Sequence, residues 1–170
     1  KEEDGRPAIL VLSDVSGSCA GFSEDALVVA KAVSEIGVAG ADVVVVAHSN
    51  GFPEEIKINR GRVKNCDFVY EEDAVKAKDF YANLLQKYRV EVVVALGDAD
   101  AEWLYRFIAS SASVRRVLWL SNYACNRIDP KKARCDFGWG KLAIAKLTYV
   151  IGCKDAGEFV AGLNLCISGG

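Results

Sequence analysis

The chain has 170 residues, of which 51% are apolar and 26% are charged, and its formal net charge is −2. This balance is typical of a globular protein with a substantial core. A nearly neutral charge without a basic stripe argues against a nucleic-acid-binding protein. No apolar run approaches the roughly 18 residues of a membrane span, and no signal-peptide pattern opens the chain.

We expect residues 1–170 to form a single domain, with residues 1–7 as a solvated lead-in and residues 166–170 as a tail. The sequence begins with lysine and contains no methionine, which indicates a processed product or a domain excised from a longer chain. Its six cysteines form no CxxC pair, which favours a reducing, cytoplasmic compartment. Cys125 and Cys135 flank a predicted loop, so a disulfide between them stays open.

The first predicted element is a buried strand over residues 8–12, because a short apolar run is bounded there by proline and a Gly/Ser cluster. Asp14, Ser16 and Ser18 follow it at every second position, and a tight loop can bring their side chains together. One carboxylate and two hydroxyls suit Mg²⁺, Ca²⁺ or Mn²⁺ better than zinc. The alternative is a strand-to-helix turn in which these side chains only cap backbone amides.

A helix over residues 23–36 and a valine-rich strand over residues 42–47 come next, which predicts a βαβ unit with a parallel strand pair. His48, Ser49 and Asn50 follow that strand. Ligands of open α/β sheets bind beyond the carboxyl ends of strands, so these residues are candidates for a functional rim. A lone histidine at such a place is nevertheless more often a hydrogen-bonded loop residue.

Alternating isoleucines and a turn predict a short edge hairpin over residues 55–63. A helix over residues 74–88 and a strand over residues 90–96 come after it. Asp98 follows this strand, where it could complement the carboxylate of the first strand end. Asp100 precedes another helical stripe, so it is a candidate N-cap as well as a rim residue.

The remaining elements continue the alternation of strands and helices. The strand over residues 114–120 is followed by Asn122 and Tyr123, which are further rim candidates. The last elements are a long loop (124–140), a strand (146–153) and a closing helix (155–165). The pattern predicts a three-layer α/β fold with a mainly parallel six-stranded sheet, helices on both faces and one antiparallel edge strand.

The residues Asp14-Val15-Ser16-Gly17-Ser18 resemble the DxSxS signature of von Willebrand factor type A (VWA) domains, which have a Rossmann-like fold. In that family the signature opens the metal-ion-dependent adhesion site. The resemblance implies that Asp14, Ser16 and Ser18 hold Mg²⁺, or Mn²⁺ or Ca²⁺. It also implies that Asp98, at the place of the family's Thr-Asp-Gly stretch, faces the same metal.

One part of the family pattern is missing. VWA domains place a threonine ligand in a later loop, whereas the only threonine here is Thr148, within a predicted strand. Either Asp67 or an acidic residue of 71–73 takes its place, or the site lacks this ligand. Its absence puts ligand-regulated switching in question.

The resemblance implies a protein–protein interaction module rather than an enzyme. Its metal would accept a carboxylate from a partner protein, with no role for nucleic acid or membrane. One alternative is an interaction domain with a degenerate metal site. Another is a Mg²⁺-dependent hydrolase or phosphoryl-transfer enzyme, although the second aspartate of haloacid dehalogenases is replaced by Ser16 and no phosphate-binding GxxxxGK[ST] loop is present. A nucleophilic Ser16 or Ser18 would lack a visible base.

Overall fold

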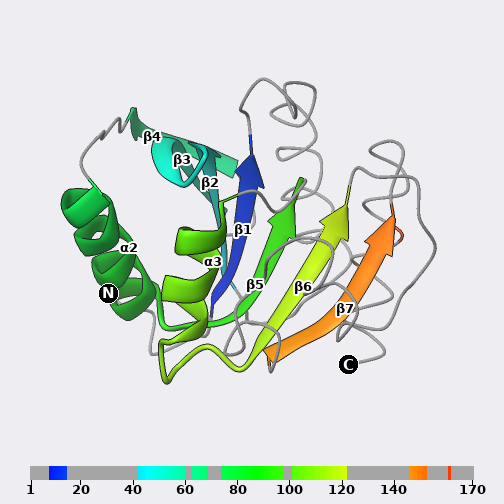
Figure 1. Ribbon diagram of the computed structural model, residues 1–170. Coiled ribbons are helices and arrows are strands. Elements are labelled where there is room, and N and C mark those ends of the chain that lie inside the picture. The colour runs from blue at the N-terminus through cyan, green and yellow to red at the C-terminus, as the bar shows by residue number, and fades with distance from the viewer. Residues whose placement is uncertain are drawn as a thin grey trace.

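The computed structural model describes residues 8–14, 42–59, 63–68, 74–97, 101–121, 146–152 and 161. Within them lies a sheet of seven strands in the order β4-β3-β2-β1-β5-β6-β7 (Figure 1). In chain order the strands are β1 (Ala8–Asp14), β2 (Asp42–Ser49), β3 (Phe52–Asn59), β4 (Val63–Phe68), β5 (Val90–Leu96), β6 (Arg116–Ser121) and β7 (Leu147–Gly152), and the helices are α2 (Ala74–Tyr88) and α3 (Glu102–Ala109).

Five neighbouring strands of this sheet, from β2 through β1, β5 and β6 to β7, run parallel. Their carboxyl ends therefore share one edge, which is the upper edge in Figure 1. The chain moves outward from β1 to β2 and then returns to β5 on the other side of β1. This reversal of strand order is where open α/β sheets form their ligand crevices. We call the edge formed by the carboxyl ends of these five parallel strands the carboxyl edge.

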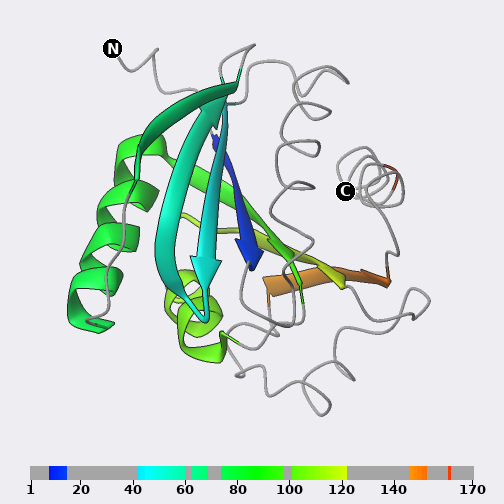
Figure 2. The ribbon, with the colours of Figure 1, turned by 90° about the horizontal axis from the view of Figure 1, so that it is seen from above.

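The central strands are buried on both faces, as expected for parallel strands. On one face, Leu10 and Leu12 belong to a core cluster that also contains Tyr81 of α2 and Leu104 of α3. Figure 2 shows both helices on that side of the sheet. On the other face Val11 is equally inaccessible to solvent. Continuous apolar runs rather than alternating ones are the sequence pattern that such double burial produces.

The prediction of a mixed α/β fold with a mostly parallel sheet is confirmed. The predicted number of six strands is wrong, because the antiparallel edge is a hairpin of two full strands, β3 and β4, instead of one short strand. β3 starts at Phe52, directly after a two-residue turn at Asn50 and Gly51, whose φ angles are 52° and 98°. Such positive angles are required by the tight hairpin turn that Asn-Gly favours.

Several predicted elements cannot be compared with the structure. The helices over residues 23–36 and 155–165 and the loop over residues 124–140 lie outside the described residues, except for residue 161, which is helical. Neither described helix has the length and hydrophobicity that crossing a bilayer requires.

Candidate functional site

The carboxyl edge carries polar groups that are completely shielded from solvent. Asp14 ends β1, lies opposite His48 of β2 in the parallel register, and is fully buried, as is His48. Buried charged and polar groups are stable only when hydrogen bonds or charges compensate their lost hydration. The groups around His48 make this compensation for the imidazole.

His48 connects the hairpin turn to α3 through both nitrogens of its ring. The backbone N–H of Gly51 donates to Nδ1 at 3.0 Å, and the Tyr105 hydroxyl lies 3.4 Å from Nε2. Since Nδ1 accepts a hydrogen bond, the neutral ring carries its proton on Nε2 and donates it toward Tyr105. Tyr105 also packs edge-on against the imidazole, with ring centroids 6.1 Å apart. His48 therefore stabilises the turn and has a structural role.

Two aromatic residues of the helices hold the same turn. The Tyr81 hydroxyl of α2 donates to the Gly51 carbonyl at 3.0 Å, and Trp103 Nε1 of α3 donates to the Asn50 carbonyl at 3.0 Å. Burial raises the pKa of Tyr81 far above its usual value, so the phenol stays protonated and remains a donor. Trp103 also packs on Phe52 at the start of β3, with ring centroids 5.5 Å apart. The turn is thus anchored to α2, α3 and β2 together.

Replacing Gly51 with alanine is expected to lower the free energy of unfolding by about 1–3 kcal/mol. The φ angle of +98° disfavours any side chain. A Cβ atom at this position would also clash with the indole ring of Trp103, since it would lie 2.5 Å from Cζ2. Urea unfolding measures the loss. The control is Asn50→Gly, which suits the positive φ at the neighbouring position. Equal stability of Gly51→Ala and the unmodified chain would contradict the described turn.

The ends of β5 and β6 are also tied together at the carboxyl edge. Trp119 of β6 is fully buried, and its Nε1 donates to the carbonyl of Gly97 at 2.7 Å. Gly97 follows β5 and has a φ of 133°, a conformation that glycine adopts without the penalty a side chain would add. The segment that leaves β6 therefore starts from a rigid pair of strand ends.

The predicted site residues are only partly within the described chain. His48 lies in the interior, Ser49 is half-buried, and Asn50 is exposed at the turn. Asp14 is the one predicted metal ligand that is described. The others lie outside the described residues: Ser16, Ser18 and Asp98 among the metal ligands, and Asp100, Asn122 and Tyr123 among the rim residues.

The metal site stays a prediction. Among the described residues, no group of three or more His, Cys, Asp or Glu side chains is placed to hold an ion. The expected Mg²⁺, the expected carboxylate from a partner protein and the single-domain boundaries are not tested by these residues. Helix α3 begins after Ala101 rather than after Asp100, without a side-chain cap.

Similar folds occur among solved structures. A secreted C11 cysteine protease from Bacteroides thetaiotaomicron, in complex with an irreversible peptide inhibitor, matches with a TM-score of 0.52 and 11% identity over 88% of this chain. A second structure of a secreted C11 cysteine protease from the same organism, iotapain, matches with a TM-score of 0.50 and 10% identity over 89% of the chain. No protein-family model and no curated protein matches the sequence.

These likenesses concern the fold, and the chain spans only about half of each neighbour, 49% and 53% of their lengths. They overturn the identification with VWA domains, and with it the metal-dependent interaction module and the expectation that the chain is not an enzyme. An acidic residue and a Gly/Ser-rich stretch after a buried strand are common in the sequences of ligand-binding α/β sheets, so the signature does not specify one family. The neighbours are secreted, so the expected cytoplasmic location is not supported either.

Sequence reasoning missed the aromatic side chains that hold the turn. Tyr81 lies in the helix predicted over residues 74–88, but helical spacing does not reveal its hydrogen bond to a residue 30 positions away. Asn50-Gly51 was the available signal, because Asn-Gly between two strand-like runs predicts a tight hairpin. Recognising that hairpin would have placed His48 next to a turn rather than on an open rim.

Proposed function

We propose that this chain is the α/β domain of a thiol peptidase, which cleaves a peptide bond through a cysteine thiolate. The observation that carries the proposal is the likeness in fold to the two secreted cysteine proteases. The seven-stranded sheet supports it, since its five parallel strands present their carboxyl ends and a reversal of strand order at one edge, where α/β enzymes bind ligands. We also propose that helices cover the second face of the sheet.

Cys125 is the proposed nucleophile. It follows the last residue of β6 by four positions, and four residues of fully extended chain span at most about 14 Å. Cys19, Cys153 and Cys166 stand beside apolar segments and are assigned to core packing. Cys135 follows the end of β6 by fourteen positions, so the chain that links it to this strand is much longer. Cys66 belongs to β4 at the antiparallel edge of the sheet, away from the parallel strand ends. Cys125 is therefore only a few residues along the chain from the carboxyl edge. The hydrogen bond from Trp119 to Gly97 holds the end of the strand that precedes it.

In the proposed reaction the thiolate attacks the scissile carbonyl carbon. The C–N bond breaks, the amine leaves after taking up a proton, and water then hydrolyses the thioester to release the acid and the thiol. His48 is not assigned as the base. Both of its ring nitrogens are engaged, and β2 lies three strand positions from β6, which corresponds to roughly 14 Å. The proposal therefore separates the reactive thiol from the structural imidazole.

Reaction with an electrophilic peptide tests this assignment. The full chain is treated with a peptidyl chloromethyl ketone, and the modified residue is located by mass spectrometry of a digest. We expect modification at Cys125, loss of modification in Cys125→Ala, and unchanged modification in the matched variant Cys66→Ala. His48→Asn, which keeps an acceptor for Gly51, should retain most of the labelling. Equal labelling of Cys66 and Cys125, or none, would count against the proposal.

A further inference from the structure

A pocket of about 570 Å³ opens at the amino-terminal ends of β5 and β6, at the opposite end of these strands from the carboxyl edge. Its volume lies within the range of small-molecule sites. The last turns of α2 and α3, the start of β5 and the loop that leads into β6 line it. Its lining includes Leu85, Arg89, Glu91, Phe107 and Arg115.

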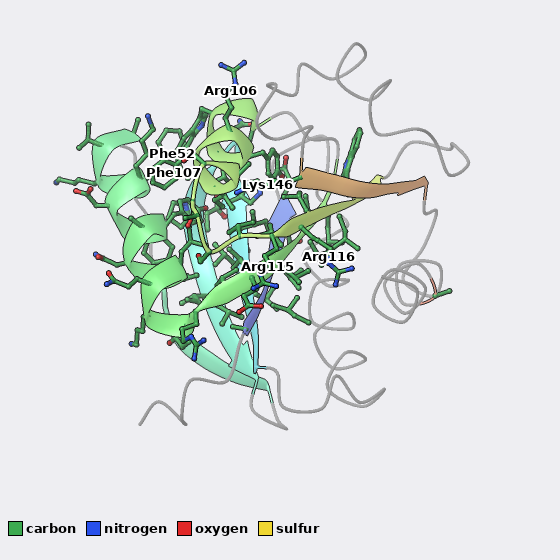
Figure 3. The ribbon with its side chains drawn as sticks, turned by 90° about the horizontal axis from the view of Figure 1, so that it is seen from below. Phe52, Arg106, Phe107, Arg115, Arg116 and Lys146 are labelled. Carbon is green, nitrogen blue, oxygen red and sulfur yellow. The ribbon has the colours of Figure 1, made fainter. Side chains whose placement is uncertain are left out.

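Two guanidinium groups and one carboxylate are the charged side chains that line this pocket. Arg115 is exposed, and its backbone N–H donates to the carbonyl of Glu91 at 2.8 Å, which fixes the loop against β5. Arg89 is exposed on the α2 side of the pocket. Figure 3 shows Arg115 beside the strands, whereas Arg106 projects outward from α3, well away from Arg115. Guanidinium groups bind carboxylates in a two-pronged geometry.

The backbone of Arg89 has a conformation that suits glycine better than arginine. Its φ angle is 53°, in the left-handed region where glycine or asparagine is the usual residue. The position closes α2, since the Arg89 N–H donates to the Gln86 carbonyl at 3.3 Å, and the Arg89 carbonyl accepts from Ala8 at 3.2 Å. Glycine would satisfy these bonds without strain.

The remaining lining restricts the kind of anion. Both α2 and α3 end at the pocket, and helix carboxyl ends carry partial negative charge. Together with Glu91 they disfavour a dianion such as phosphate. Leu85 and Phe107 supply apolar surface beside the charged groups. We propose that this pocket binds a monocarboxylate with an apolar body, either a small N-acylated acid or the carboxyl terminus of a peptide.

The test is a calorimetric titration of the full chain with N-acetyl-L-leucine, with N-acetyl-L-leucinamide and inorganic phosphate as the uncharged and dianionic comparisons. We expect the acid to bind, and the amide and phosphate to bind at least tenfold more weakly. Arg89→Gly and Arg115→Ala should each weaken binding of the acid by about tenfold or more. Arg89→Gly also suits the left-handed backbone, so it removes the charge without adding backbone strain.

Three further arms complete the design. Arg106→Ala, which removes an arginine from α3 outside the pocket, should leave the affinity unchanged. Glu91→Gln should strengthen binding, since it removes the one lining carboxylate. A hexapeptide ending in leucine, compared with its amidated form, distinguishes a peptide terminus from a small acid by which binds more tightly. Binding of phosphate equal to that of the acid, an unchanged affinity in Arg115→Ala, or no binding of the acid or the peptide overturns the proposal. None of these results depends on the thiol chemistry at the carboxyl edge.

Discussion

Replacement of Trp119 by alanine is expected to lower the free energy of unfolding by about 3–5 kcal/mol. The side chain is fully buried in the core cluster, and alanine would leave a cavity that the sheet and α3 can close only in part. The change also removes the donor that Gly97 faces at the end of β5. Urea unfolding, followed by far-ultraviolet circular dichroism, gives the size of the loss.

Trp119→Phe separates packing from hydrogen bonding. Phenylalanine keeps most of the apolar volume but leaves the buried Gly97 carbonyl without its donor, so a loss of about 1–3 kcal/mol is expected. If the tie between the ends of β5 and β6 supports the proposed nucleophile, this variant should also react more slowly with the electrophilic peptide. A phenylalanine variant as unstable as the alanine variant would show that the hydrogen bond, rather than the packing, dominates.

His48→Leu should be the most damaging conservative-sized change at the hairpin turn. Leucine fills similar space, but it leaves the N–H of Gly51 without its acceptor and the hydroxyl of Tyr105 without the imidazole. Each buried polar group left unsatisfied costs about 1–3 kcal/mol. We therefore expect a loss larger than that of any surface substitution, measured by urea unfolding.

His48→Asn is the matched variant, since its amide oxygen can stand where Nδ1 accepts from Gly51. It should recover a substantial part of the stability that His48→Leu loses. Tyr105→Phe removes only the second contact and should fall between the two. Equal stability of the leucine and asparagine variants would mean that the hydrogen bond to the turn contributes little.

The central sheet was predictable because its signals are local. The valine run that became β2 and the run that became β5 are continuous apolar stretches, and only doubly buried parallel strands require this pattern. α2 was equally clear, since Ala77, Tyr81, Leu84 and Leu85 recur at helical spacing and all are buried. Their bounds in the structure, Val90–Leu96 and Ala74–Tyr88, match the predicted ranges.

The identity of the site was not predictable in the same way. Asp14 at the end of a strand followed by serines fits several chemistries, and the choice among them depends on which other strand ends stand nearby. The register places Asp14 beside His48, and His48 in turn is fixed by residues that lie 3 and 57 positions further along the chain. The contact with Tyr105, 57 positions away, leaves no periodic pattern in a single sequence.

The position of β1 in the middle of the sheet has a consequence for folding during synthesis. Its first partner, β2, follows within some forty residues. Its other neighbour, β5, begins only at Val90, and Leu12 of β1 pairs with Ala95 of this later strand. At cellular elongation rates the β5 side of β1 waits on the order of ten seconds for its partner. Until then, an apolar strand with free backbone groups along one side is open to pairing with other chains. Pairing between residues so far apart also slows folding of the complete chain. We therefore expect folding yield to depend strongly on protein concentration and on chaperones that shield β1 until β5 has emerged.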